Sequence, residues 1–189
     1  MTKPITLIQD VATLRALCGD HHPHTPYKVQ DHLTEQAQNF VRRSPFVLLS
    51  TIGQSGETTI SPKGGAPGFV GMGDDKTLYL PDQRGNNLIF SLQNILGNPQ
   101  VGLLFLVPGT GETLRVHGRA SLTADEDICR QYLIGKKPAR LVTIIEMDSA
   151  YFHCSRSLYT SAIWDPNSWT EQIAISWQDE IGPNLPEEE

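Results

Sequence analysis

The spacing of the strand-like segments in the middle of the chain constrains the fold more than any other feature. "FVLLSTIG" (46–53) and "TTISP" (58–62) are separated only by the turn "QSGE" and read as a β-hairpin. Further strand patterns follow at 77–81, 101–109, 112–124 and 140–154. Most of the connections between them are too short for repeated parallel crossovers, which need a dozen residues or more. The chain is therefore predicted to be mainly β, an antiparallel barrel with peripheral helices rather than a doubly wound sheet.

Helical patterns flank and interrupt these strands. Residues 10–19 begin at Asp10, a typical capping residue, and end at Gly19. Residues 30–45 place Leu33, Ala37, Phe40 and Val41 on one helical face. Shorter helices are expected at 87–97, where Asn87 would be the first residue, and at 124–135. We expect a helical extension at 1–43, the barrel domain at 44–165, and a C-terminal segment with an acidic tail at 166–189.

Composition excludes several classes of protein. The formal net charge of −6 argues against a general nucleic-acid binder, which would present a basic face. The three cysteines form no CxxC pair and indicate reduced thiols in a cytoplasmic protein. The N-terminus lacks the uninterrupted apolar core of a signal peptide, and the longest apolar runs are too short to span a bilayer. We expect a soluble cytoplasmic protein.

Two polar segments share a composition that suits phosphate. "SPKGG" carries Ser61 and Lys63, and "LPDQRGNN" carries Arg84, Asn86 and Asn87. In each, a cation lies beside glycine, which lets backbone N–H groups approach a ligand closely. Arg84 adds a planar fork, and a helix that starts at Asn87 would favour an anion. Together the segments predict a phosphate pocket, although each by itself could be an ordinary turn.

The 112–124 segment alternates, with Leu114 and Val116 on one face and Arg115, His117 and Arg119 on the other. The charged face is either a solvated stripe or a ligand or interface surface.

The sequence gives less support to a metal site, a nucleophilic pair or a catalytic acidic cluster. The cluster His21, His22 and His24 matches no zinc spacing, so no metal site is predicted. His153 and Cys154 are neighbours on a predicted strand and point to opposite faces, which makes a nucleophilic pair unfavourable. The acidic run at 125–127 suits helix capping. No Walker, GxGxxG or GxSxG pattern occurs, so an enzyme would depend on a cofactor for its reactivity.

The ordered series "FVLLSTIGQSGETTISPKGG", "LYLPDQRGNNLIFSLQNILGNPQVGLLFLVPG", "ETLRVHGRASL" and "YFHCSRSLYTSAIW" resembles the pyridoxamine 5'-phosphate oxidase-like FMN-binding proteins. The likeness runs from about Phe46 to Trp164. It is to a largely uncharacterised branch, because the residue pattern with which the true oxidases hold their substrate phosphate is not found. The resemblance implies a split β-barrel that forms a homodimer, with FMN bound at the subunit interface.

The resemblance also implies a set of cofactor-binding residues. Ser61, Lys63, Arg84 and Asn87 would contact the phosphate or the ribityl chain, and Pro81 and Asp82 would lie along the cofactor. Arg115, Arg156 and Trp164 would reach the flavin from across the dimer. The full set expected at the cofactor is Ser61, Pro62, Lys63, Gly64, Pro81, Asp82, Arg84, Gly85, Asn86, Asn87, Arg115, Arg156 and Trp164.

Three functions follow as hypotheses. The first is an FMN-dependent oxidoreductase that transfers a hydride through flavin N5 on an unknown small molecule, with no catalytic residue identified. The second is a flavin-binding protein or sensor without turnover. The third is haem binding, for which His117 and His153 are conceivable ligands.

Overall fold

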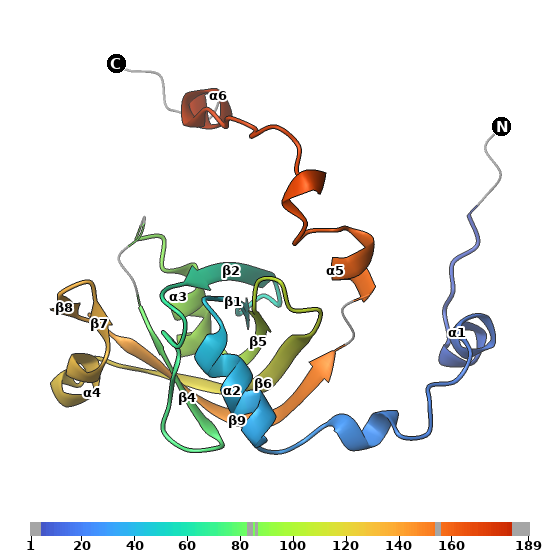
Figure 1. Cartoon of the computed structure of the whole chain (residues 1–189), viewed down its shortest axis with the longest axis horizontal. Helices are drawn as coiled ribbons and strands as arrows, with labels where there is room; N and C mark the ends of the chain where they lie inside the picture. The colour runs from blue at the N-terminus through green and yellow to red at the C-terminus, as the bar shows by residue number, and fades with distance from the viewer. Residues whose placement is uncertain (1–4, 83–84, 86, 154–155, 183–189) are drawn as a thin grey trace. The chain divides into compact units, whose positions relative to one another are not determined.

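The computed structural model describes residues 5–82, 85, 87–153 and 156–182. The chain divides into two compact units, Met1–Cys154 and Ser155–Glu189. The first contains the sheets and helices α1 to α4, and the second contains α5 (Arg156–Thr160), the short 3-10 helix η2 (Pro166–Ser168) and α6 (Trp177–Ile181) (Figure 1). The domain boundaries expected at residues 43 and 165 stay predictions.

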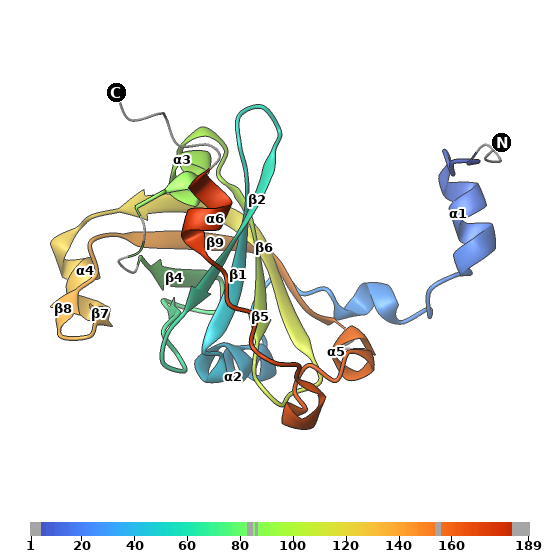
Figure 2. The ribbon, with the colours of Figure 1, turned by 90° about the horizontal axis from the view of Figure 1, so that it is seen from above.

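The first unit is built on one antiparallel sheet of seven strands in the order β2-β1-β5-β6-β9-β4-β3. It curls so that strands β1, β5 and β6 lie between the β2 edge and the long strand β9 (Figure 2). Strands β2 and β3 remain as edges, so the barrel is split, which confirms the predicted fold. The strands are β1 (Phe46–Ile52), β2 (Thr58–Gly64), β3 (Gly71–Met72), β4 (Thr77–Pro81), β5 (Gln100–Leu106), β6 (Thr113–Thr123) and β9 (Val142–His153).

Alternating side chains fill the inside of this sheet. In β6, Leu114 and Val116 are fully buried, whereas Arg115 is half-buried and His117 is exposed, as the sequence predicts. Phe105 of β5 is also fully buried. Because strand residues alternate between faces, the buried residues of β1, β5 and β6 come from one face of each strand and join one core.

Helix α2 (Glu35–Arg43) closes the core on the side predicted from its spacing. The Thr34 hydroxyl caps the helix by accepting from the Ala37 N–H at 3.3 Å. Ala37 and Val41 are buried together with Leu33, and Phe40 packs against the same core. Helix α1 (Val11–Cys18) has the predicted Asp10 cap and ends at Gly19, with a φ of 74°, but buries none of its residues. The 3-10 helix η1 (Thr25–Lys28) follows it.

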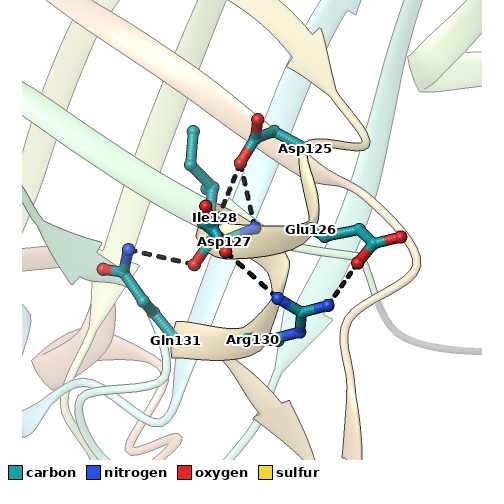
Figure 3. A network of polar contacts seen from close by, with 6 residues as sticks. All are labelled: Asp125, Glu126, Asp127, Ile128, Arg130 and Gln131. Atoms are coloured by element: carbon teal, nitrogen blue, oxygen red, sulfur yellow. Dashed lines mark hydrogen bonds and ion pairs between the residues drawn. The ribbon is translucent and has the colours of Figure 1, made fainter.

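The acidic run at 125–127 caps helix α4 (Glu126–Gln131), as expected (Figure 3). The Asp125 carboxylate accepts from the N–H groups of Asp127 and Ile128, each at 3.0 Å. Arg130 pairs with Asp127 at 3.1 Å and also with Glu126. The helix is shorter than predicted, because residues 133–138 form the small hairpin of β7 (Leu133–Ile134) and β8 (Lys137–Pro138).

The long β6–β9 pairing contains one irregularity, between His117 and Gly118. A Cβ atom on Gly118 would lie 2.2 Å from the Glu146 carbonyl oxygen and 3.0 Å from the Met147 Cα, both backbone atoms. Backbone atoms of a central strand cannot move aside locally, so only glycine fits at this position.

We expect Gly118→Ala to lower the free energy of unfolding by about 3 kcal/mol or more, the upper range for overpacking a core. Gly102→Ala, on the neighbouring strand, is the matched control, because its Cβ would meet no atom closer than 3.7 Å. Urea unfolding of both variants measures the difference. Equal stability of the two variants would show that the Gly118 contact is relieved without cost.

Candidate functional site

Strand β2 extends further into the "SPKGG" residues than the sequence predicts. The prediction placed this stretch at the end of a strand, but β2 continues through Gly64, where Lys63 pairs with Val47 and Gly64 with Phe46. Pro62 is accommodated because β2 is an edge strand. Thr59, Ser61 and Lys63 therefore share one face at a spacing of two residues, which is the face that lines the cavity described below.

Helix α3 (Phe90–Gly97) also departs from the prediction. It begins at Phe90 rather than at Asn87, because Asn87 and Ile89 adopt left-handed backbone conformations with φ values of 58° and 45°. A β-branched residue such as Ile89 rarely adopts this conformation, so the chain stores strain at the entry to the helix. Among the described residues, no side chain caps the helix N-terminus. Asn87 lies in the turn before it.

A small polar network holds α3 against the sheet. The Asn94 amide donates to the hydroxyl oxygens of Thr51 at 3.0 Å and Thr59 at 3.2 Å, and these hydroxyls lie 2.8 Å apart. Thr51 is fully buried, as is most of Ile95 on the same helix. The network therefore joins α3 to β2 through Asn94, since Thr59 lies on the strand that carries Ser61 and Lys63.

A cavity of about 230 Å³ lies between β2 and the first turn of α3. Five of the predicted cofactor residues line it, which are Ser61, Lys63, Asp82, Gly85 and Asn87. Among the described residues Lys63 has no ion-pair partner. The rest of the lining consists of Thr59, Ile60, Leu88, Ile89, Phe90, Ser91, Leu92 and Arg140.

Arg140 is the cavity residue that sequence reasoning missed. Its Nη2 lies 3.7 Å from Asp82 Oδ2 and donates to Asn87 Oδ1 at 3.4 Å. The Asp82 side chain is only 14% exposed, and its backbone N–H donates to the Leu141 carbonyl at 3.0 Å. Arg140 reaches the cavity because Val142 pairs with Pro81, which places the end of β4 beside the start of β9. This pairing joins segments about sixty residues apart, and no local motif marks it.

Of the other predicted residues in the described part of the first unit, none lines this cavity. Pro62 points to the exposed side of β2, Pro81 is buried at the end of β4, and Gly64 pairs with Phe46. Arg115 lies on β6 beside Tyr151, with its guanidinium carbon 6.0 Å from the ring centroid. Arg156 and Trp164 belong to the second unit. Arg84 and Asn86 lie outside the described residues.

The histidines give no metal centre within the described part of the chain. Groups of three or more histidine, cysteine or carboxylate side chains that could hold a metal ion are absent there, His21, His22 and His24 included. His117 and His153 lie on different strands, and their positions differ by four residues along the register, since His153 pairs with Thr113 and His117 with Ser149. Of the described helices, none has the length and apolar character needed to cross a membrane.

The fold is a split barrel, and two cationic side chains, Lys63 and Arg140, line a cavity beside its edge strand β2. The family model described as pyridoxamine 5'-phosphate oxidase matches residues 33–154, well over half of the chain. The chain belongs to this pyridoxamine 5'-phosphate oxidase-like family. The match begins at Leu33 and includes helix α2, earlier than the sequence resemblance indicates.

Solved structures agree with the fold. HupZ of Group A Streptococcus is 17% identical, with a TM-score of 0.53, and the match covers 65% of this chain and 94% of that one. A variant of HupZ gives 17% identity and a TM-score of 0.54, over 64% and 99% of the two chains. A protein from Lactobacillus delbrueckii described as a pyridoxamine 5'-phosphate oxidase is 21% identical, with a TM-score of 0.50, over 65% and 95%. At these identities the likeness shows the fold. No curated protein matches the chain.

We expect Asn94→Ala to lower the free energy of unfolding by about 1–2 kcal/mol, because the Thr51–Thr59 pair loses its amide partner. Gln93→Ala is the control, since Gln93 is exposed on the same helix and should change stability by less than about 0.5 kcal/mol. Chemical denaturation measures both. Equal small effects would show that the network does not hold α3.

Proposed function

We propose that the chain is a flavoprotein that binds FMN, with the phosphate in the cavity between β2 and α3. The observation that carries the proposal is that Lys63, on β2, and Arg140, just before β9, line one cavity although they are far apart in the sequence. Asp82 offsets part of this charge and leaves the site net positive, which suits a phosphate dianion. The remaining predicted phosphate ligand, Arg84, stays a prediction.

The residues present fit a phosphate in other respects. The Ser61 and Ser91 side chains can donate hydrogen bonds, and the uncapped start of α3 offers backbone N–H groups toward the same cavity. Arg140 is oriented by Asp82 and Asn87, so its guanidinium is positioned before a ligand arrives. Asp82 can also accept from hydroxyl groups of a ribityl chain. These groups would hold the phosphate and the neighbouring ribityl chain of the cofactor.

The proposed reaction is a hydride transfer on an unidentified small molecule. When bound, FMN supplies the hydride acceptor at N5 of its ring. The protein's part in such a reaction is to hold the cofactor by its phosphate and to position the ring, which requires no protein nucleophile. The competing possibility is a flavin-binding protein without turnover. The same cavity would hold the phosphate in the oxidoreductase and in the binding protein.

We further propose that the chain forms a homodimer around the flavin. The support is that the outer face of β1 and β5, opposite the core, carries the half-buried apolar side chains Phe46, Leu48, Leu104 and Leu106. These residues pair across the two strands and form one apolar strip. A mass near twice 20.9 kDa in light scattering supports the dimer, and a mass near 20.9 kDa contradicts it.

We expect the purified protein to bind FMN at micromolar concentrations and riboflavin at least tenfold more weakly, because riboflavin lacks the phosphate. Quenching of flavin fluorescence on titration measures both affinities. Binding of neither flavin at these concentrations would exclude the proposed function.

Charge removal tests the phosphate contacts. Lys63→Gln and Arg140→Gln should each weaken FMN binding by about tenfold or more, since a hydrogen bond to a charged group contributes about 1.5–3 kcal/mol. Riboflavin binding should change by less than about threefold in either variant. Lys137→Gln is the control, because it removes an exposed cation from the β8 strand with the same change in net charge. Equal losses for FMN and riboflavin would contradict the assignment of the phosphate to this cavity.

Turnover separates the enzyme from the binding protein. The FMN-loaded protein is mixed anaerobically with NADH, NADPH or a reduced deazaflavin, and the visible absorbance of the flavin is followed. Bleaching that sustains repeated turnover with an added acceptor supports the oxidoreductase. Flavin that stays oxidised with all three donors favours binding without turnover.

A further inference from the structure

A second group of cations gathers around Tyr151, away from the cavity between β2 and α3. Lys28 Nζ lies 5.6 Å from the centroid of the Tyr151 ring, and the Arg115 guanidinium carbon lies 6.0 Å from it. The His117 ring stacks on the same ring, with centroids 6.2 Å apart and planes at 25°. We call these four residues the Tyr151 cluster.

The backbone fixes the members of the Tyr151 cluster in place. Arg115 stands directly opposite Tyr151 in the β6–β9 pairing, and His117 is opposite Ser149. Lys28 is held there because Gln30 pairs with Ala150 of β9, with N–H to carbonyl distances of 2.9 and 2.8 Å. The segment that precedes the barrel therefore places Lys28 beside Tyr151, at a position that the pairing of β6 with β9 determines.

The segment that carries Lys28 makes further contacts with the barrel after Gln30. The Leu33 N–H donates to the Asp75 carbonyl at 2.7 Å, and Asp31 pairs with Lys76 at 2.8 Å. The pKa of Asp31 is lowered to about 2 by its hydrogen bond from His32 and by Lys76. The segment that carries Lys28 is thus joined to the barrel at three successive points.

The two cations of the Tyr151 cluster lack acidic partners. Within the described ranges, no carboxylate lies at ion-pair distance from Lys28 or Arg115. This is notable in a chain with 21 acidic and 15 basic residues, where Lys76 and Arg130 do have such partners. Attraction to one tyrosine ring at an exposed site is weak, and the two like charges repel each other.

Space for a ligand adjoins the Tyr151 cluster. Lys28 and Tyr151 line a cavity of about 190 Å³, together with the polar residues Gln30 and His32, whereas Arg115 and His117 do not line it. The side chains around it are rich in hydrogen-bond donors. Asp148 lines a different cavity, of about 380 Å³, with His117.

We propose that the cavity beside Tyr151 is a second anion site, which binds a small oxyanion, a phosphate or a carboxylate, at Lys28, with Arg115 close by across the Tyr151 ring. The anion supplies the negative charge that the protein does not provide there. Gln30 and His32, which line the same cavity, add side chains that can donate hydrogen bonds. The proposal does not depend on a phosphate bound between β2 and α3, because none of the four residues of the Tyr151 cluster lines that cavity.

The proposal is tested by titrating the full chain with inorganic phosphate at constant ionic strength and measuring the changes in its amide chemical shifts by NMR. The Lys63→Gln, Arg140→Gln double variant serves as background, so that the other cavity does not compete for phosphate. We expect saturable shifts at Lys28, Arg115 and Tyr151 with a Kd of about 1 mM or below. A parallel titration with acetate distinguishes a phosphate site from a carboxylate site. Tighter phosphate binding identifies a phosphate site, and tighter acetate binding identifies a carboxylate site.

In the same background, Lys28→Gln and Arg115→Gln should each weaken binding by at least about fivefold, whereas Lys137→Gln should leave it unchanged. Lys28 is exposed, so its variant tests the site even if the half-buried Arg115 is needed for folding. Arg115→Lys, which keeps the charge, should retain most of the binding. Shifts that do not saturate up to about 20 mM of either anion, or an unchanged affinity in Lys28→Gln, would overturn the proposal.

Discussion

The antiparallel pairing of β6 with β9 is the constraint on which the other features of the first unit depend. It runs from Thr113 opposite His153 to Thr123 opposite Val142, and is interrupted once, at Gly118. The start of β9 then pairs with β4 and brings Arg140 to Asp82. Its end pairs with Gln30 and brings Lys28 to Tyr151. Pairing with β9 thus positions Arg140 at the cavity between β2 and α3 and Lys28 beside Tyr151.

Local patterns were sufficient to predict the elements that a short stretch of sequence specifies. The alternation of Leu114 and Val116 with Arg115 and His117 predicted which face of β6 is buried, because strand geometry has a period of two residues. The spacing of Leu33, Ala37 and Val41 predicted the buried face of α2 for the corresponding helical reason. Short connections predicted the antiparallel sheet, since they exclude parallel crossovers.

Features that depend on distant pairing could not be predicted in this way. Arg140 stands before a strand with no glycine or phosphate motif beside it, and it reaches the cavity only through the β4–β9 register. "SPKGG" suggested a turn, yet pairing with β1 keeps β2 extended through Gly64. The start of α3 moved from Asn87 to Phe90 because two residues before it take left-handed conformations, which neither Asn87 nor Ile89 signals locally.

The central claim is that the cavity between β2 and α3 holds the phosphate of FMN. A crystal structure of the protein grown with FMN tests it most directly. The account predicts phosphate oxygens at about 2.7–2.9 Å from Lys63 Nζ and from an Arg140 guanidinium nitrogen, the usual range for charged hydrogen bonds. FMN bound with its phosphate outside this cavity, for example between Lys28 and Arg115, would contradict it.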